Sequence, residues 1–157
     1  MKKKLFVIAS ALMLLGFVSL NVFSQKKPVV IEFERLSSYV NDWDKRRDGE
    51  HLIVNVAATI DSIQYQKSNN LYSFQAGENT DVGSTFFSSP ILGKSLRQRL
   101  SQHSEASVYV YCTLVQFVGE QDVFRAPFVT KVEGFDGHGR LVWTVVGPPP
   151  AKLKMSQ

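Results

Sequence analysis

The chain has 157 residues, a single cysteine and a formal net charge of +4. Most of that charge belongs to Lys2, Lys3 and Lys4, because the rest of the chain has fifteen basic and fourteen acidic residues. This near balance argues against a nucleic-acid-binding protein, which normally carries a strong basic patch. One cysteine excludes an internal disulfide, so the fold depends on its hydrophobic core.

The N-terminal segment has the three parts of a secretory signal peptide. Its basic start is followed by an apolar run from Leu5 to Val22 and by small or aliphatic residues before Gln25. We predict cleavage after Ser24, so that residues 1–24 are a signal peptide and the mature chain is periplasmic or secreted. The alternative is an uncleaved anchor, because the apolar run is nearly long enough to span a bilayer. No cysteine lies near this site, which excludes a lipid-anchored lipoprotein.

Residues 25–147 are expected to form one domain, because a chain of this size has one hydrophobic core. Pro148 to Pro150 end regular structure, and residues 148–157 are predicted to be a flexible tail. Cys112 lies within an apolar strand and is expected to be a small buried hydrophobic residue. An intermolecular disulfide through Cys112 is the alternative.

The first predicted elements are a strand and a short helix. Val29 to Phe33 is extended and is expected to add an edge strand. An apolar spacing of three and four predicts an amphipathic helix that begins near Ser37 or Ser38; the apolar residues are Leu36, Tyr39, Val40 and Trp43. The charged run from Asp42 to Glu50 is mixed in sign and is predicted to be a solvated loop. Arg46 and Arg47 exclude a calcium-binding loop there.

The segment from His51 to Tyr65 is predicted to be the first long strand. Its apolar residues change parity near Ile60, as a bulge or sharp bend would require. Asn69 and Asn70 then provide a turn. Residues 71–76 and 85–88 are predicted to form the second and third strands.

A helix and a long fourth strand follow. Ser89 is a predicted N-cap with Pro90 at the first helical position. The apolar stripe that should pack on the core is Ile91, Leu92, Leu96 and Leu100. From Ser107 to Gly119 the chain has no charged residue, which predicts a central strand with both faces covered.

The C-terminal part is predicted to hold two more strands. Phe124 to Phe135 forms the fifth strand, in which Pro127 indicates an edge position or a bulge. The reverse-turn sequence Asp-Gly-His-Gly at 136–139 leads into a sixth strand at 141–146. Leu141, Trp143 and Val145 are expected to share the inner face of that strand.

This order of elements predicts a mainly β fold: a five- to six-stranded OB-fold-like barrel with a helix between strands 3 and 4. Residues from about Val29 to Phe135 also resemble the bacterial extracytoplasmic OB-fold proteins of tRNA-anticodon-like type. The resemblance lies in three hydrophobic segments, 54–63, 86–92 and 108–117. It implies a binding or structural module and transfers no active-site residue.

The usual ligand surface of this barrel covers the second and third strands. The candidate ligand-binding residues are therefore Lys67, Tyr72, Phe74, Phe86 and Arg125. Aromatic rings interleaved with cations can stack on oligonucleotides or sugars. The alternative is that alternate members of this set are core residues, and packing favours that alternative.

No catalytic residue, metal site or cofactor is predicted. His51, His103 and His138 are not at metal-binding spacings, and no nucleophile-elbow, phosphate-loop or dinucleotide motif is present. The segment Asp136 to Leu141 echoes thermonuclease-like secreted nucleases, which are also OB-folds. The Asp-Thr-Pro turn that precedes this segment in those nucleases is missing here, so an ordinary hairpin turn explains the similarity of the segment better.

The sequence therefore predicts an exported, non-catalytic OB-fold module of the cell envelope that binds a peptide, a glycan or an envelope protein. A secreted hydrolase of thermonuclease type on the same barrel is the first alternative. The second is a structural envelope component held in the membrane by an uncleaved leader.

Overall fold

The structure is a computed structural model that describes residues 27–42, 49–56, 60–76, 85–102, 107–118 and 123–150. The predicted signal peptide, Trp43, His103 and residues 151–157 of the predicted tail lie outside these ranges. Neither of the two helices in the described ranges is long and apolar enough to cross a membrane.

The described part of the chain is mainly β, as predicted, but its sheet has eight strands instead of the expected five to six, together with two helices. In chain order the elements are β1 (Val29–Glu32), α2 (Phe33–Asn41), β2 (His51–Val56), β3 (Ile60–Gln66), β4 (Leu71–Ala76), β5 (Phe86–Ser88), α3 (Pro90–Leu100), β6 (Ser107–Val118), β7 (Val123–Phe135) and β8 (Leu141–Val146).

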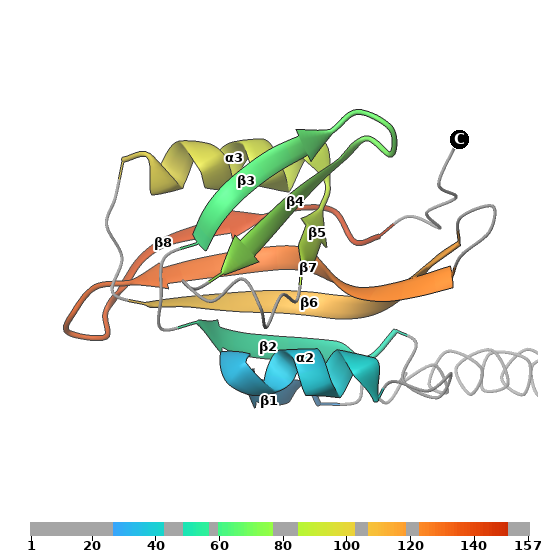
Figure 1. The fold of residues 1–157 in the computed structure, drawn as a ribbon. Coiled ribbons are helices and arrows are strands. Elements are labelled where there is room, and N and C mark those ends of the chain that lie inside the picture. The colour runs from blue at the N-terminus through green and yellow to red at the C-terminus, as the bar shows by residue number, and fades with distance from the viewer. Residues whose placement is uncertain are drawn as a thin grey trace, which may run out of the picture.

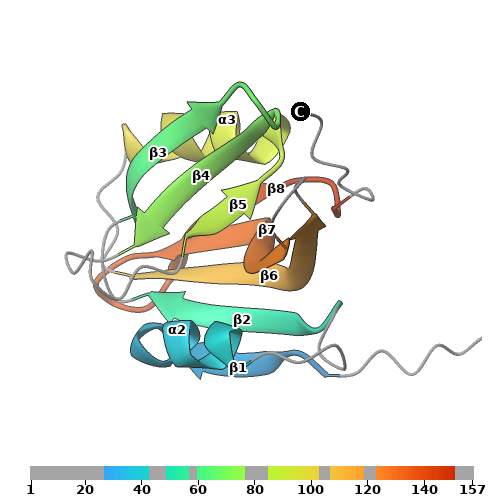
Figure 2. The same cartoon turned by 45° about the vertical axis from the view of Figure 1, so that its right-hand side comes forward.

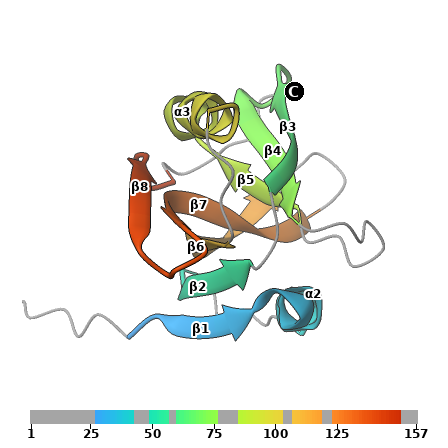
Figure 3. The same ribbon diagram turned by 90° about the vertical axis from the view of Figure 1, so that its left-hand side faces the viewer.

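All eight strands belong to one mixed sheet in the order β1-β2-β6-β7-β5-β4-β3, with β8 paired to β7 (Figure 1). The pairs β1–β2 and β5–β7 are parallel, and the other five are antiparallel. Figures 2 and 3 show the sheet strongly curved, with β1 and α2 at one end of the molecule and α3 at the other. Among the described residues the sheet is not closed by hydrogen bonds.

Strand β3 is at one end of the main strand path and β2 is next to β1 at the other end, yet β2 and β3 are consecutive in the chain. β2 pairs with β6, whereas β3 pairs with β4. Only residues 57–59 connect them, so the Cα atoms of Val56 and Ile60 are at most about 14 Å apart. The sheet must therefore curl back until its two ends meet. The sequence predicted one bent strand at 51–65. In the structure this segment is divided into β2, which pairs with β6, and β3, which pairs with β4, and the division lies close to the predicted change of apolar parity.

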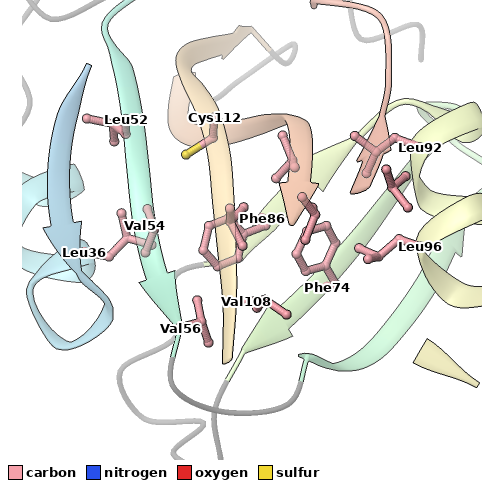
Figure 4. Close-up of a cluster of buried hydrophobic side chains, with 14 of the residues drawn as sticks. Leu36, Leu52, Val54, Val56, Phe74, Phe86, Leu92, Leu96, Val108 and Cys112 are labelled. Carbon is pink, nitrogen blue, oxygen red and sulfur yellow. The ribbon is translucent and has the colours of Figure 1, made fainter. Parts of the chain in front are cut away.

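The curled sheet encloses one main hydrophobic cluster (Figure 4). This cluster takes Val54 from β2, Val110 from β6, Phe74 from β4 and Leu96 from α3, all at most 1% exposed. A smaller second cluster lies on the other face of the sheet; its buried members are Leu71, Phe87, Phe117, Ala126 and Phe128. Most of the apolar side chains thus serve packing.

Strand β6 has the central place that its uncharged sequence predicted. It lies between β2 and β7 and sends Val108, Val110, Cys112 and Leu114 into the main cluster. Phe117, on its other face, belongs to the second cluster. Cys112 is buried and free, as predicted for a small hydrophobic residue, and burial raises the pKa of its thiol far above the usual range.

Helix α3 begins as predicted. The Ser89 hydroxyl accepts a hydrogen bond from the Leu92 amide at 3.3 Å, and Pro90 is the first helical residue. Leu92 and Leu96 are fully buried, but the prediction for Ile91 was wrong, because its side chain is 66% exposed. Gly93 takes the inward position instead: a Cβ atom there would lie 2.3 Å from Cγ of Tyr72. The helix approaches Tyr72 of β4 so closely that no side chain fits at position 93.

The N-terminal elements match the predicted types. β1 is an edge strand, parallel to β2, and α2 follows it without a loop. The predicted start at Ser37 or Ser38 was wrong, since the helix begins at Phe33 without a side-chain cap. The fully buried Leu36 fixes the inner face of α2. Packing against the core, rather than a capping serine, sets this helix start.

The predicted turn at Asn69 and Asn70 and the predicted irregularity near Ile60 both occur in the structure. Asn70 has a φ angle of +55°, and the β3–β4 register shifts between Asp61 and Gln64. Pro127 lies in a stretch of β7 that pairs with β6 but with neither β5 nor β8, which agrees with the predicted edge position. In β8, Trp143 and Val145 are buried, but Leu141 is 54% exposed because the register shifts next to it.

The α3 stripe gives the first testable prediction. Leu96→Ala should lower the free energy of unfolding by about 2–5 kcal/mol, because it removes a fully buried side chain and leaves a cavity. Ile91→Ala is the matched control on the same helix and should change it by no more than about 0.5 kcal/mol. Urea unfolding followed by circular dichroism measures both, and equal losses would contradict the placement of α3.

Candidate ligand-binding surface

Two of the five residues predicted to bind a ligand are core residues. Phe74 and Phe86 face each other across the β4–β5 pair, and their rings stack with centroids 5.3 Å apart. They are 1% and 0% exposed, respectively, and both belong to the main cluster. The prediction placed Phe74 and Phe86 on the ligand-binding face of these strands, but both lie on the inner face that packs in the core.

The other three residues lie in different surroundings. Tyr72 is half-buried between the Tyr65 ring, 5.3 Å away, and Gly93 of α3. Lys67 is exposed in the β3–β4 turn, and Arg125 is half-buried on β7. The five residues therefore do not form one aromatic and cationic surface. The opposite face of β4 and β5 presents Leu71 and Phe87 instead, and these are buried in the second cluster.

A cluster that the sequence analysis missed lies on the outer face of β6 and β7, and is formed by Tyr111, Lys131 and Glu133. The Tyr111 hydroxyl donates a hydrogen bond of 2.7 Å to Oε2 of Glu133. Nζ of Lys131 lies 2.8 Å from Oε1 of the same carboxylate and 3.6 Å from the centroid of the Tyr111 ring. Both carboxylate oxygens are engaged, and the ammonium group binds both the anion and the ring.

The outer-face cluster shifts the ionisation of its members in consistent directions. The hydrogen bond from Lys131 lowers the pKa of Glu133, and the bond from Tyr111 acts the same way against the effect of burial. The hydrogen bond to Glu133, together with burial, raises the pKa of Tyr111. At neutral pH the cluster therefore holds an anion, a cation and a neutral phenol.

A hollow of about 310 Å³ adjoins this cluster. It is lined by Pro28, His51, Leu52, Tyr111, Cys112, Thr130 and Lys131. Thr130 is the extra residue where the register of β6 and β7 shifts, and its hydroxyl donates to the Tyr111 carbonyl at 3.3 Å. The bulge thus brings a polar side chain and the Lys131 ammonium to a mainly apolar hollow, which suits a small polar ligand better than a purely apolar one.

Two of the three histidines lie in the described ranges. Nδ1 of His51 lies 3.1 Å from the Thr113 hydroxyl at the rim of the hollow, and His138 is exposed in the β7–β8 turn. Within the residues that the structure describes, no group of three histidine, cysteine, aspartate or glutamate side chains is arranged to hold a metal ion.

The turn that echoes a nuclease motif has a structural explanation. Oδ1 of Asp136 accepts hydrogen bonds from the amides of His138 and Arg140, both at 2.9 Å, and Nε of Arg140 donates to Oδ2 at 2.9 Å. These bonds, first that from the Arg140 amide, lower the pKa of Asp136. The carboxylate and the guanidinium group thus stabilise the turn that they flank.

Part of the outer-face cluster was accessible from the sequence. Lys131 and Glu133 are two residues apart in a predicted strand, which places them on one face. The register that sets Tyr111 opposite Lys131 depends on the bulge at Thr130, and no residue pattern predicts it. Comparison with protein-family models, curated protein sequences and solved structures finds no match.

The outer-face cluster predicts a pH-dependent stability. Glu133→Gln should lower the free energy of unfolding at pH 7 by about 1–3 kcal/mol, because it removes a charged hydrogen-bond acceptor. The folded-state pKa of Glu133 is lowered, so its contribution is present above the unfolded pKa of about 4.3. It is lost as the pH falls through the folded pKa, and the difference between the two proteins should shrink toward pH 3.

Urea unfolding at pH 7, 5 and 3 measures this difference. Glu32→Gln is the matched control, since Glu32 is exposed. Within the described ranges its carboxylate accepts one hydrogen bond, from the side-chain amide of Asn55 at 3.3 Å. It should change stability by no more than about 0.5 kcal/mol at each pH. A Glu133→Gln penalty that stays constant down to pH 3 would contradict the assigned network.

Proposed function

We propose that the chain is an exported, non-catalytic binding module of the cell envelope, built on an OB-fold barrel. The strand connectivity carries the proposal. In an OB barrel the bent first strand pairs with the second and fourth strands, and the third lies parallel to the fifth. The pairs β2–β6, β3–β4 and β5–β7 have these relations if β2 and β3 are the two halves of the first strand.

The remaining elements fit the same assignment. Helix α3 lies between the third and fourth barrel strands, β5 and β6. Strands β1 and β8 are then additions at two positions of the sheet. The likeness to extracytoplasmic OB-fold proteins of tRNA-anticodon-like type agrees with this connectivity, and the apolar N-terminal leader supports export.

The proposed ligand surface is the hollow beside the outer-face cluster. Its lining combines an aromatic ring, apolar floor residues, the Lys131 ammonium donor and the polar side chains of Thr130 and His51. Aromatic and apolar area packs on sugar rings or short side chains, while donors bind hydroxyl and carboxylate oxygens. Soluble peptidoglycan fragments carry all of these groups and are therefore the ligand that we propose for an envelope protein.

Titration of the ¹⁵N-labelled chain with a purified muropeptide mixture tests the binding surface. Amide signals of His51, Tyr111 and Thr130 should shift with saturation, and His51→Ala should weaken binding. His138→Ala is the matched control, because His138 is an exposed histidine in the β7–β8 turn and does not line the hollow. Absence of saturable shifts at the hollow, or equal weakening by both variants, would refute this ligand assignment.

Two further assays test export and the absence of catalysis. Mass spectrometry of the native protein should show Gln25 as its first residue; a retained leader would favour an anchored component.

Incubation with single-stranded DNA and Ca²⁺ should give no cleavage. Cleavage that Arg140→Ala abolishes would replace the binding module by a hydrolase of thermonuclease type.

A further inference from the structure

A second concave surface lies between α3 and β8, and it differs from the hollow beside Tyr111. This α3–β8 groove encloses about 340 Å³. One wall consists of exposed polar side chains at the C-terminal end of α3: Ser95, Gln98, Arg99 and Gln102. The other wall is Thr144 to Val146 of β8. Figure 1 shows α3 along the side of β8 that β7 does not occupy.

The backbone of β8 presents unpaired hydrogen-bonding groups to this groove. The Gly147 amide donates to the Thr130 carbonyl at 2.9 Å, and the register continues through Val145 opposite Val132. Because hydrogen-bonded and non-hydrogen-bonded pairs alternate in an antiparallel ladder, Thr144 and Val146 direct their N–H and C=O groups away from β7. Within the described ranges, no other strand or side chain binds these groups.

The groove half of β8 lacks the features that usually block an edge strand. Leu141 to Val146 contains no charged residue and no proline. Its one register irregularity is at the other end, between Leu141 and Trp143. Val146 is 64% exposed. Such an edge is a template for another extended segment, and proteins normally protect it with charge, proline, a bulge or a covering helix. Here α3 flanks the edge but leaves the groove between them.

The charge of the groove indicates what kind of segment would add to this edge. Helix α3 contains Lys94, Arg97 and Arg99 and no acidic residue, and β8 contributes no charge. Arg99 lines the groove, is exposed and makes no ion pair with any residue in the described part of the chain. Its guanidinium group is suited to bind a carboxylate in a bidentate manner.

We propose that the α3–β8 groove binds an extended peptide segment that bears an acidic side chain. The peptide would add to the sheet as a strand beside β8, with its backbone bonded to Thr144 and Val146 and its carboxylate bonded to Arg99. Gln98 and Gln102 provide further amide donors and acceptors on the helix wall. The segment 151–157 is a poorer occupant, because it carries Lys152 and Lys154 and no acid.

Fluorescence anisotropy with the full chain and a labelled peptide, Gly-Ser-Thr-Val-Glu-Val-Thr-Ser-Gly, tests this proposal. Saturable binding is expected, and Arg99→Glu should weaken it about fivefold or more, because it replaces attraction by repulsion. Arg97→Glu is the matched control, since Arg97 is an exposed cation of the same helix that does not line the groove. It should leave the affinity within about twofold.

Two altered peptides separate charge from backbone pairing. Glutamine in place of the glutamate should weaken binding less than Arg99→Glu does, because it removes the attraction without adding repulsion. N-methylation of alternate backbone amides should abolish binding. In the bound state, the amides of Thr144 and Val146 should exchange with solvent more slowly, and those of the hollow, at Tyr111 and Thr130, should be unchanged.

Several outcomes would overturn the proposal. They are absence of saturable binding by the glutamate peptide, equal affinity of the Arg99→Glu and Arg97→Glu proteins, and undiminished binding of the N-methylated peptide. Protection of Thr144 and Val146 that rises with protein concentration and without peptide would assign the groove to a second copy of the chain. Because the readout is at β8, failure here is distinguishable from failure of ligand binding at the hollow.

Discussion

The structure depends on one topological constraint: β2 and β3 are joined by three residues but lie five positions apart in the main strand path. In a flat sheet, β2 and β3 would be five strand spacings apart, or about 24 Å. The short connection excludes that distance and forces the sheet to curl. The residues on its concave face, among them Val54, Phe74 and Phe86, then meet in one cluster.

Curling determines which residues remain available for binding. The inner face of the sheet is filled by the main cluster, and α3 covers it with Leu92 and Leu96. On the outer face, the second cluster occupies β4, β5 and the parts of β6 and β7 that hold Phe117, Ala126 and Phe128. The half-buried groups of Tyr111 and Lys131 therefore remain accessible on another part of β6 and β7, and exposed side chains remain along the β8 edge. The hollow beside Tyr111 and the α3–β8 groove lie in these two places.

Local features were predictable from the sequence because they depend on a few neighbouring residues. The Ser89 cap, the left-handed Asn70 and the central place of β6 each follow from the chemistry of a short segment. The element types and their order were also predictable, because periodicity and turn residues encode them. The OB-fold itself stays a proposal, since the described strands do not close by hydrogen bonds.

The candidate site was far less predictable, for geometrical reasons. The parity of Phe74 and Phe86 is visible in the sequence, but which parity faces inward depends on the direction in which the sheet curls. Ile91 was assigned to the α3 stripe, but at 3.6 residues per turn it lies about 140° around the helix from Leu96, so burial of Leu92, Gly93 and Leu96 leaves it exposed. The cluster around Glu133 depends on the bulge at Thr130, which brings Lys131 opposite Tyr111.

The curled sheet is tested most directly by nuclear Overhauser effects across the core. Methyl groups of Val54 and Val56 on β2 should show cross-peaks, directly or through Val108, with the rings of Phe74 and Phe86, which belong to the same cluster (Figure 4). Selective methyl labelling with protonated phenylalanine in a deuterated chain makes these signals assignable. A continuous set of such cross-peaks is the result that we expect. Their absence, with the strand pairs otherwise intact, would mean that the sheet is open and flat and would contradict the account.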